Sequence, residues 1–362
     1  MKVVIFAGGF GRRLWPISLS SSPKQFEPII GERSTIQLAV DRVIGQLGAE
    51  NIFISTNKRY ADIIREQLPD VPAHNVIGEP TRRDLAAAVG LAMIHLARSS
   101  DPDEPVGILW GDNYMKEIPT FQKIIGTAET IISEKKANIV FMGESPRFAN
   151  ANLGWIDLGE KLGQVDGTPY YKFGKLTYRP PQEDCDKMFA SGSCVWNTGY
   201  FVTSVGYVTE AYKQFMPKMW AQLEEIGSKI GTDEYEATLD RIYPTLEKLS
   251  FDDAILTHLD STGTCVLHAP MGWSDPGTLY ALKEAINPSE EENVTRGLVV
   301  DAESKDCLVY NYQADKLVMA VGMEGMIVVN TPNAVLVVHK SDIKKVKALV
   351  EEFAGTDLEK YS

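Results

Sequence analysis

The chain has 362 residues, a formal net charge of −13 and no apolar run near the ~20 residues that cross a bilayer. The negative charge argues against nonspecific binding to nucleic acid or to an anionic membrane, although local positive charge can still bind a nucleotide. The sequence begins directly with an expected strand, so we predict no signal peptide and a cytoplasmic protein. The cysteines are widely spaced without a C-x-x-C pair, which favours reduced structural thiols over disulfides or zinc ligands.

The chain opens with an apolar run, residues 3–7, that leads directly into a glycine-rich turn. Such a run is typical of a strand buried on both faces of a parallel sheet. Three glycines let the turn bend sharply and approach a ligand closely: Gly8, Gly9 and Gly11. Three basic side chains add positive charge: Arg12, Arg13 and Lys24. This combination at a strand's carboxyl end is suited to binding a triphosphate.

Two familiar phosphate motifs are absent from this stretch. It lacks the lysine position of a Walker A loop, and Leu14 stands where G-x-G-x-x-G requires its third glycine. A dinucleotide-binding oxidoreductase is therefore disfavoured.

Strand and helix patterns then alternate as far as residue 143. We expect strands at residues 51–55, 76–78, 106–110 and 138–143, and helices at residues 34–47, 59–68, 84–98 and 119–135. The repeated βα pattern predicts an α/β fold with a doubly wound sheet and ligands outside the carboxyl ends of its strands.

The pattern changes after about residue 145. We expect an insertion on the substrate side with strands at residues 152–158, 170–178 and 194–202 and a helix at residues 182–191. Helices should follow at residues 216–226, 234–243 and 251–258. From residue 293, short apolar runs predict a small β-rich unit closed by a helix at residues 341–353. We therefore predict a large domain over residues 1–290 and a β-rich domain over residues 291–362.

Two aspartates follow apolar stretches that end in turns. Asp112 comes after the expected strand at 106–110, and Asp275 comes after the stretch 266–273. Either alone would most often be a turn or capping residue. Together they suit Mg²⁺, which typically takes one or two carboxylates in addition to phosphate oxygens and water.

The string GGFGRRLWP at residues 8–16, followed by PKQF at 23–26, resembles the signature loop of sugar-1-phosphate nucleotidylyltransferases, in particular the mannose-1-phosphate guanylyltransferases. Further segments resemble other motifs of that family in the same order: EPTRR at 79–83, GDN at 111–113, WNTGYF at 196–201, SFDDA at 250–254 and GWSDPGT at 272–278. The resemblance covers essentially the whole chain. It implies a Rossmann-like mixed sheet of the nucleotide-diphospho-sugar transferase type with a C-terminal β-helix-like domain.

The resemblance also implies a reaction and a set of site residues. A sugar 1-phosphate, with mannose 1-phosphate expected, would attack the α-phosphorus of GTP with Mg²⁺, giving GDP-mannose and pyrophosphate. The residues implied for catalysis are Arg13, Lys24 and Asp112, and those for the metal are Asp112 and Asp275. The nucleotide would contact Gly8, Gly9, Gly11, Arg13, Lys24, Glu79 and Arg83. The sugar would contact Gly154, Tyr178, Arg179 and Asn197.

The sequence departs from the family pattern mainly at recognition positions. Asp84 and Leu85 replace an asparagine and a threonine near the expected nucleoside, while Tyr178 and Arg179 replace a glutamate and a lysine near the expected sugar. A tyrosine cannot accept hydrogen bonds from two hydroxyls as a carboxylate does. The identities of the nucleotide base and of the sugar therefore stay open. A nucleotidylyltransferase for another pair of nucleotide and sugar is an alternative.

The main alternative from a different class is a noncatalytic nucleotide-sugar sensor or regulatory subunit. The chain retains the residues expected to bind phosphate and metal, which argues against this alternative: Arg13, Lys24, Asp112 and Asp275. The resemblance further implies a possible homodimer through the C-terminal unit. Because the sequence stops at Ser362, we expect no phosphomannose isomerase domain after it.

Overall fold

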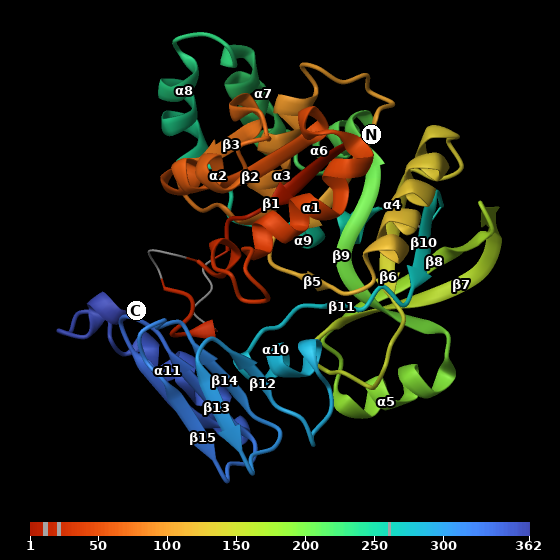
Figure 1. The fold of residues 1–362 in the computed structure, drawn as a ribbon. Helices are drawn as coiled ribbons and strands as arrows, with labels where there is room; N and C mark the ends of the chain where they lie inside the picture. The colour runs from red at the N-terminus through yellow and green to blue at the C-terminus, as the bar shows by residue number, and fades with distance from the viewer. Residues whose placement is uncertain (10–13, 20–22, 260–261) are drawn as a thin grey trace. The chain divides into compact units, whose positions relative to one another are not determined.

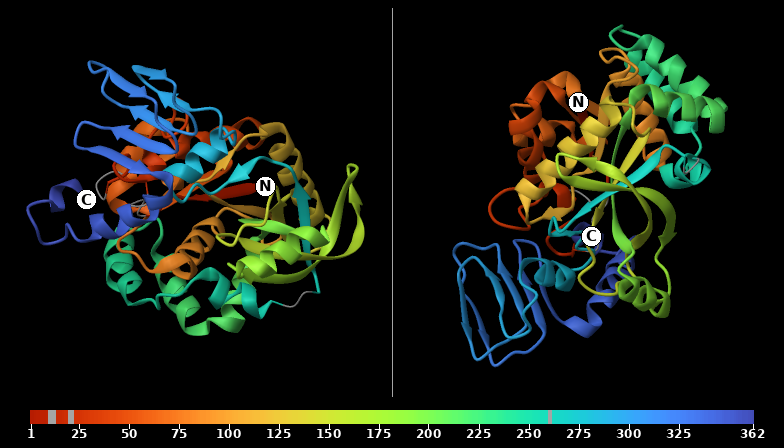
Figure 2. Two further views of the ribbon diagram at one scale, coloured as in Figure 1. Left: turned by 90° about the horizontal axis from the view of Figure 1, so that it is seen from below. Right: turned by 90° about the vertical axis from the view of Figure 1, so that its right-hand side faces the viewer.

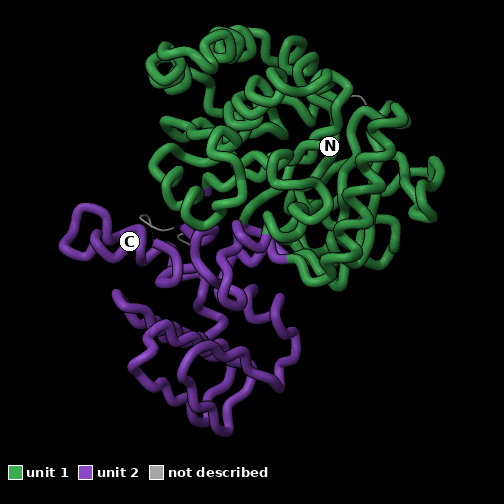
Figure 3. Tube along the Cα trace, turned by 45° about the horizontal axis from the view of Figure 1, so that its top comes forward, with its two compact units in different colours: residues 1–8, 39–111, 115–273 green, residues 9–38, 112–114, 274–362 purple. Residues whose placement is uncertain are grey.

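A computed structural model describes residues 1–9, 14–19, 23–259 and 262–362. The chain divides into two compact units, which Figure 3 shows in different colours. Unit 1 comprises residues 1–8, 39–111 and 115–273, and unit 2 comprises residues 9–38, 112–114 and 274–362. The domain boundary between residues 290 and 291 stays a prediction. No helix in the described part of the chain is long and apolar enough to cross a membrane.

Unit 1 is built on a nine-stranded mixed sheet with the order β3-β2-β1-β4-β9-β6-β10-β8-β7. Its strands are β1 (Lys2–Phe6), β2 (Ile52–Asn57), β3 (Val76–Glu79), β4 (Pro105–Trp110), β6 (Ile139–Glu144), β7 (Gly154–Val165), β8 (Thr168–Tyr178), β9 (Cys194–Ser204) and β10 (Thr264–Ala269). Strand β9 is antiparallel to both β4 and β6, so these two run in the same direction as β1. The first residues of β9 therefore lie at the edge where the parallel strands end, which confirms the predicted mixed α/β sheet.

The connections are helical or short. The helices before α10 are α1 (Thr35–Leu47), α2 (Ala61–Gln67), α3 (Asp84–Leu96), α4 (Ile118–Ser133), α5 (Gln182–Ser191), α6 (Val205–Phe215), α7 (Pro217–Lys229), α8 (Tyr235–Ile242) and α9 (Phe251–Ala254). Two short strands, β5 (Tyr114–Met115) and β11 (Trp273–Ser274), complete this part of the chain. Figure 2 shows β7 and β8 as a long curved ribbon.

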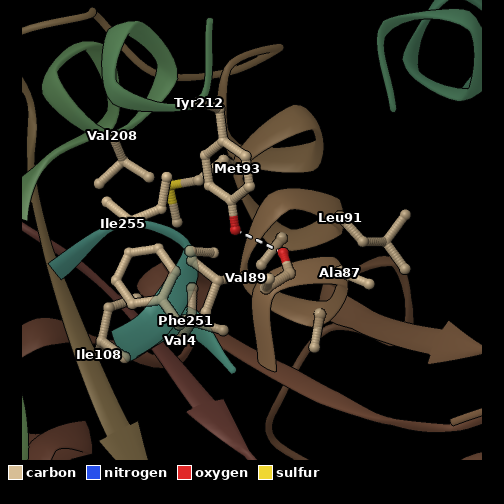
Figure 4. Packing of buried hydrophobic residues seen from close by; sticks show 14 of the residues in the cluster. Val4, Ala87, Val89, Leu91, Met93, Ile108, Val208, Tyr212, Phe251 and Ile255 are labelled. Carbon is tan, nitrogen blue, oxygen red and sulfur yellow. Dashed lines mark hydrogen bonds between the residues drawn. The ribbon is translucent and has the colours of Figure 1, made fainter. Parts of the chain in front are cut away.

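The central core of unit 1 forms around helix α3. Its residues 86–94 are buried, and the alanines permit close approach of neighbouring elements. A Cβ on Gly90 would lie 2.4 Å from a methyl carbon of Leu223, so this position is held to glycine by packing. In Figure 4 the side chain of Tyr212 lies beside Met93 of this helix, and the Tyr212 hydroxyl donates to the Ala86 carbonyl.

Several predicted elements differ from the structure. Helix α6 was not predicted, although Ser204 caps it by accepting from the Tyr207 amide at 3.2 Å. Strand β7 continues well beyond the predicted 152–158 because it pairs along its length with β8. The helix predicted at 251–258 is divided into α9 and a 3-10 turn, Leu256–His258. The four cysteines are buried and free, as predicted.

Unit 2 contains the terminal strands, coiled so that successive turns pair in parallel (Figure 1). One sheet has the order β12-β14-β16-β17 and the other pairs β13 with β15. The bounds are α10 (Leu279–Ile286), β12 (Val294–Arg296), β13 (Val299–Ala302), β14 (Leu308–Asn311), β15 (Val318–Val321), β16 (Met326–Asn330), β17 (Val335–His339) and α11 (Ile343–Glu351). This arrangement confirms the predicted small β-helix-like domain with a closing helix; α10 and β12 were not predicted.

The core of unit 2 also includes part of the signature loop. Leu14, Ile17 and Ile29 are buried in one cluster with side chains of β14 and β16. The indole nitrogen of Trp15 donates to the Tyr361 carbonyl at 2.7 Å. The segment that follows the glycine turn is therefore built into the same body as the terminal strands.

Candidate active site

Three charged residues from separate segments of unit 2 meet at one point. The Lys24 ammonium lies 2.8 Å from Asp112 Oδ2 and 3.5 Å from Asp275 Oδ1. Lys24 stands in a short 3-10 turn, Lys24–Phe26, Asp112 follows β4 through Gly111, and Asp275 follows β11. The lysine side chain is only 7% exposed, whereas the two aspartates are 32% and 33% exposed. One buried cation thus faces two carboxylates that solvent or a ligand can still reach.

The chemistry of these donors fits a divalent metal ion. Two carboxylates against one ammonium leave a net negative charge, and carboxylate oxygens are the hard donors that Mg²⁺ prefers. No cluster of three or more histidine, cysteine, aspartate or glutamate side chains suited to a metal occurs within the described ranges. A metal bound by Asp112 and Asp275 would therefore take its remaining ligands from substrate oxygens and water.

The glycine turn next to this cluster is only partly described. Gly9 is exposed, and a Cβ placed on it would meet nothing within 4 Å. Its carbonyl accepts a 3.1 Å hydrogen bond from the buried side chain of Gln25, the residue after Lys24. The turn and the lysine are thereby linked. The predicted phosphate contacts Gly11 and Arg13 lie outside the described residues.

A second cluster lies in unit 1, at the ends of β1 and β3. Glu79, the last residue of β3, is 8% exposed, and a Cβ on the exposed Gly8 would lie 3.8 Å from Glu79 Oε1. The hydroxyl of Tyr243 donates to Glu79 Oε2 at 2.6 Å. Burial raises the pKa of Glu79 to about 7, against the opposing effect of the Tyr243 hydrogen bond. A carboxyl group that titrates near neutrality therefore stands beside Gly8.

Arg83, predicted to contact the nucleotide, is engaged elsewhere in the structure. Its guanidinium donates to the Pro244 carbonyl, while its Nε atom is buried with no hydrogen-bond partner. Glu79 and Arg83 are thus both contacted by one short turn, Tyr243–Thr245. Sequence reasoning missed Tyr243, because nothing in its local pattern indicates that it meets β3.

The four residues predicted to contact the sugar come together in unit 1. In β7, Gly154 is paired with Tyr178 of β8 on one side and with Asn197 of β9 on the other. A Cβ on Gly154 would lie 3.4 Å from the Asn197 Cβ, in van der Waals contact, so the two residues are close neighbours. The side-chain oxygen of Asn197 accepts from the Gly199 amide at 3.0 Å, which leaves the Asn197 amide group to donate elsewhere.

Tyr178 and Arg179 form a stacked pair beside Gly154. Tyr178 is 71% exposed, and the Arg179 guanidinium carbon lies 5.0 Å from the centre of its ring. Arg179 also donates from Nε to the Asn152 carbonyl at 3.2 Å. The two residues that depart from the family pattern therefore present an exposed aromatic ring, from Tyr178, and a guanidinium group stacked on it, from Arg179.

Glu144, which sequence reasoning did not single out, supports the segment that precedes Asp275. Its buried carboxylate accepts from the amides of Met271, Gly272 and Trp273 at 2.9, 3.2 and 3.2 Å. Burial raises the pKa of Glu144 to about 7, although these amides and Arg147 favour its charged form. At the end of β6, followed by Ser-Pro, it reads in the sequence as a solvated turn residue.

Comparison with known proteins identifies the family of the chain. Residues 2–292 match the family described as "Nucleotidyl transferase", and residues 297–353 match the "MannoseP isomerase/GMP-like beta-helix domain". Since the first match covers most of the chain, the chain belongs to the nucleotidyl transferase family, which confirms the predicted membership. Enzymes of this family join a nucleoside triphosphate to a sugar 1-phosphate, generally with a divalent metal.

Individual relatives are similar over nearly the whole chain. The chain is 30% identical over 361 residues to a mannose-1-phosphate guanylyltransferase of Klebsiella pneumoniae, covering 96% of this chain and 73% of that protein. It is 29% identical over 360 residues to mannose-1-phosphate guanylyltransferase 2 of Escherichia coli O157:H7, covering 96% and 72%. A crystal structure from Thermus thermophilus, described as a mannose-1-phosphate geranyltransferase, superposes with a TM-score of 0.84 over 97% of this chain and 98% of that chain, at 23% identity. That structure has the same fold.

Proposed function

We propose that this protein transfers GMP from GTP to mannose 1-phosphate, releasing pyrophosphate and GDP-mannose. The observation that carries the proposal is the meeting of Lys24 with Asp112 and Asp275, which supplies a cation for phosphate oxygens and two carboxylates for a metal ion. The guanylyltransferase names of the similar proteins support the choice of substrates. Because nucleoside triphosphates are kept inside cells, we place the reaction in the cytoplasm.

The chain's own residues would act by binding and orientation. The phosphate of the sugar substrate is already an anion, so its oxygen can attack the α-phosphorus of the nucleotide without a general base. The difficulty is bringing two anions together, and positive charge fixed before the reaction lowers that cost. Lys24 and Arg13 would supply this charge at the phosphates.

The metal ion would be Mg²⁺, held by Asp112 and Asp275. When bound, it supplies charge neutralisation at phosphate oxygens as a Lewis acid. Before the metal arrives, Lys24 would balance part of the negative charge of the two carboxylates, since it contacts both. The lysine and the metal would then share the task of balancing their negative charge.

The nucleoside and the sugar would bind at the two clusters of unit 1. Gly8 and Gly9 would lie under the base, and the buried Glu79 would accept hydrogen bonds from the N–H donors of guanine. Arg83 would act indirectly, by holding the Pro244 turn next to Glu79. Asn197, Gly154, Tyr178 and Arg179 would contact the sugar.

We also propose that two copies associate through the outer face of β13 and β15. Val300 and Met319 are directly paired across these strands and are 43% and 63% exposed. Neighbouring residues on the same strands or just before them are also exposed and apolar: Leu298, Leu317 and Val321. Contiguous apolar patches of this kind commonly mark interfaces, and a second copy supplies a matching patch.

The molar mass measured by light scattering tests this association. The native protein should be a dimer, and Met319→Lys should be a monomer. A monomeric native protein contradicts this proposal.

The proposed reaction is tested by measuring pyrophosphate release with Mg²⁺ over a grid of nucleotides and sugars. GTP, UTP, dTTP, ATP and CTP would each be paired with mannose, glucose, fucose and N-acetylglucosamine 1-phosphates. Turnover confined to GTP and mannose 1-phosphate supports the proposal. Turnover with another pair would make Asp84 and Tyr178 specificity determinants, whereas no turnover with retained nucleotide-sugar binding would favour a noncatalytic sensor.

A further inference from the structure

Helix α10 begins immediately after the segment that carries Asp275. Only Pro276 and Gly277 separate this aspartate from Thr278, the residue that caps the helix. The Thr278 hydroxyl accepts from the Ala281 amide at 3.1 Å, so the first turn is fixed at its start. Because the connection is short and contains proline, the placement of α10 restricts where the Asp275 carboxylate can lie.

The buried face of α10 carries an unusual residue for a core. Leu279 and Leu282 are fully buried, as expected for an amphipathic helix, but so is Lys283. A buried ammonium requires a charged or strongly polar partner. Lys283 Nζ lies 2.6 Å from Asp306 Oδ1, and this aspartate is itself only 2% exposed.

Asp306 connects α10 to two further parts of unit 2. It stands just before β14, and its Oδ2 atom accepts from Lys340 at 2.6 Å and from the Tyr280 hydroxyl at 2.9 Å. Tyr280 and Lys283 both belong to α10, whereas Lys340 follows β17. One buried carboxylate therefore ties the helix to the segment that leads into β14 and to the end of β17, the last strand of the β unit.

The partner of Asp275 is fixed in the same core. Leu14, Ile17 and Ile29, which flank Lys24 in the sequence, pack in one cluster with Leu279 and Leu282 of α10. Both ends of the 3.5 Å contact between Lys24 and Asp275 are thus anchored in a single packed body. Apolar packing alone would let α10 shift slightly along the β unit. An ion pair with several hydrogen bonds fixes the helix in one position.

We propose that Lys283 and Asp306 are positioning residues for Asp275. Their ion pair sets α10 on the β unit and so holds the Asp275 carboxylate where it meets Lys24 and a metal ion. The terminal β unit then has a role in the reaction besides the association of two copies. This inference rests on the proposed role of Asp275 in the transfer reaction.

The test is a double-mutant cycle of Lys283→Met with Asp275→Asn. We expect Lys283→Met to lower kcat about tenfold, the scale typical of residues that orient metal ligands, with little change in the KM of either substrate. In the Asp275→Asn background the same substitution should lower kcat no further, because it acts through the residue already removed. Lys283→Arg should restore part of the turnover.

A second readout does not depend on turnover. Binding of Mn²⁺ alone, followed by electron paramagnetic resonance, should weaken several-fold in Lys283→Met and in Asp275→Asn, and no further in the double variant. If Lys283→Met does not fold, the isosteric Asp306→Asn replaces it in the cycle. Lys305→Met is the matched control, since it removes an exposed ion pair with Glu324 within the same β unit and should change neither quantity.

The two readouts separate the possible failures. Additive losses of turnover together with unchanged Mn²⁺ binding would overturn the positioning role. A native protein that releases no pyrophosphate from any substrate pair would count against the proposed function alone. In that case the Mn²⁺ titration still decides whether Lys283 acts on Asp275.

Discussion

The ammonium of Lys24 lies 2.8 Å from the carboxylate of Asp112, with the lysine almost fully buried and the aspartate a third exposed. This asymmetry favours a site that is partly assembled before any substrate arrives. A buried cation in contact with carboxylates keeps its position, while the exposed carboxylate can exchange one partner for another. Asp275, which is also a third exposed, contacts the same ammonium at 3.5 Å.

Replacing either carboxylate by its amide should remove a metal ligand while keeping the shape of the site. We expect Asp112→Asn and Asp275→Asn each to lower kcat by roughly 10²-fold or more, the usual scale for losing one preorganised group that stabilises charge. Arg13→Ala should have an effect of similar size for the same reason. The measurement is steady-state pyrophosphate release at saturating substrates.

Asp103→Asn is the control for these substitutions. Asp103 forms an ion pair with Lys135 in which both side chains are mostly exposed, so its loss should leave turnover unchanged. Near-normal turnover in Asp112→Asn or Asp275→Asn would remove that aspartate from the mechanism.

Replacing Lys24 should separate metal binding from catalysis. In Lys24→Met the two carboxylates lose the cation that competes with a metal ion, so Mn²⁺ alone should bind more tightly than in the native protein. Turnover should nevertheless fall by roughly 10²-fold, because a fixed positive charge at the phosphates is lost. Isothermal titration and a pyrophosphate assay measure the two effects. Weaker Mn²⁺ binding would mean that Lys24 chiefly holds the carboxylates together.

The binding of GTP should depend on pH through Glu79. Its pKa is raised from 4.5 to about 7 by burial, while Tyr243 and Arg82 act in the opposite direction. Below about pH 7 the carboxyl group is protonated and loses acceptors for guanine, so the KM for GTP should rise as pH falls through that value. In Glu79→Gln the KM should be high and independent of pH over this range. The same pH dependence in both proteins would exclude Glu79 as its cause.

The same group should affect stability with a defined sign. Between about pH 4.5 and 7 the folded protein binds more protons at Glu79 than the unfolded chain does. The free energy of unfolding should therefore fall as pH rises through this window. Urea unfolding at several pH values should show a smaller fall in Glu79→Gln, with the remainder due partly to Glu144, whose pKa is also raised to about 7.

The strand ends of the fold were largely predictable from the sequence. Apolar runs followed by glycine indicated β1 and β4 directly, and the carboxyl ends of parallel strands share an edge, so ligand residues are expected there. Residues whose environment depends on distant segments were not predictable. The Glu144 carboxylate accepts from the amides of residues 271–273, which are distant in the sequence, and Tyr243 reaches Glu79 from a turn far along the chain. Lys283 is buried in the pairing of α10 with the β unit, and α10 itself was not predicted.

Restoring the family's carboxylate at position 178 should change the preference for the sugar. Tyr178 is 71% exposed at the end of β8, so Tyr178→Glu requires no repacking. A carboxylate there can accept from two sugar hydroxyls, and we expect kcat/KM for mannose 1-phosphate to rise about tenfold. Lys175→Gln, an exposed change on the same strand that also makes the charge more negative by one, is the control for charge. An unchanged or lower kcat/KM would indicate that the tyrosine itself contacts the native sugar.

Two features should restrict position 199 to glycine: its backbone conformation and the steric clash that a side chain would make. Its φ is +76°, and a Cβ would lie 2.3 Å from the indole nitrogen of Trp110. We expect Gly199→Ala to lower the free energy of unfolding by roughly 2–4 kcal/mol, from left-handed strain plus overpacking. Its amide donates to Asn197, so the KM for the sugar 1-phosphate should also rise.

Gly192→Ala isolates the backbone contribution. Gly192 has a φ of +64°, but a Cβ there would meet nothing within 4 Å, so its replacement should cost only about 1 kcal/mol and leave the sugar KM unchanged. Urea unfolding of the two variants measures the difference directly. Equal losses would show that Trp110 moves aside at little cost and that the Gly199 position is set by backbone conformation alone.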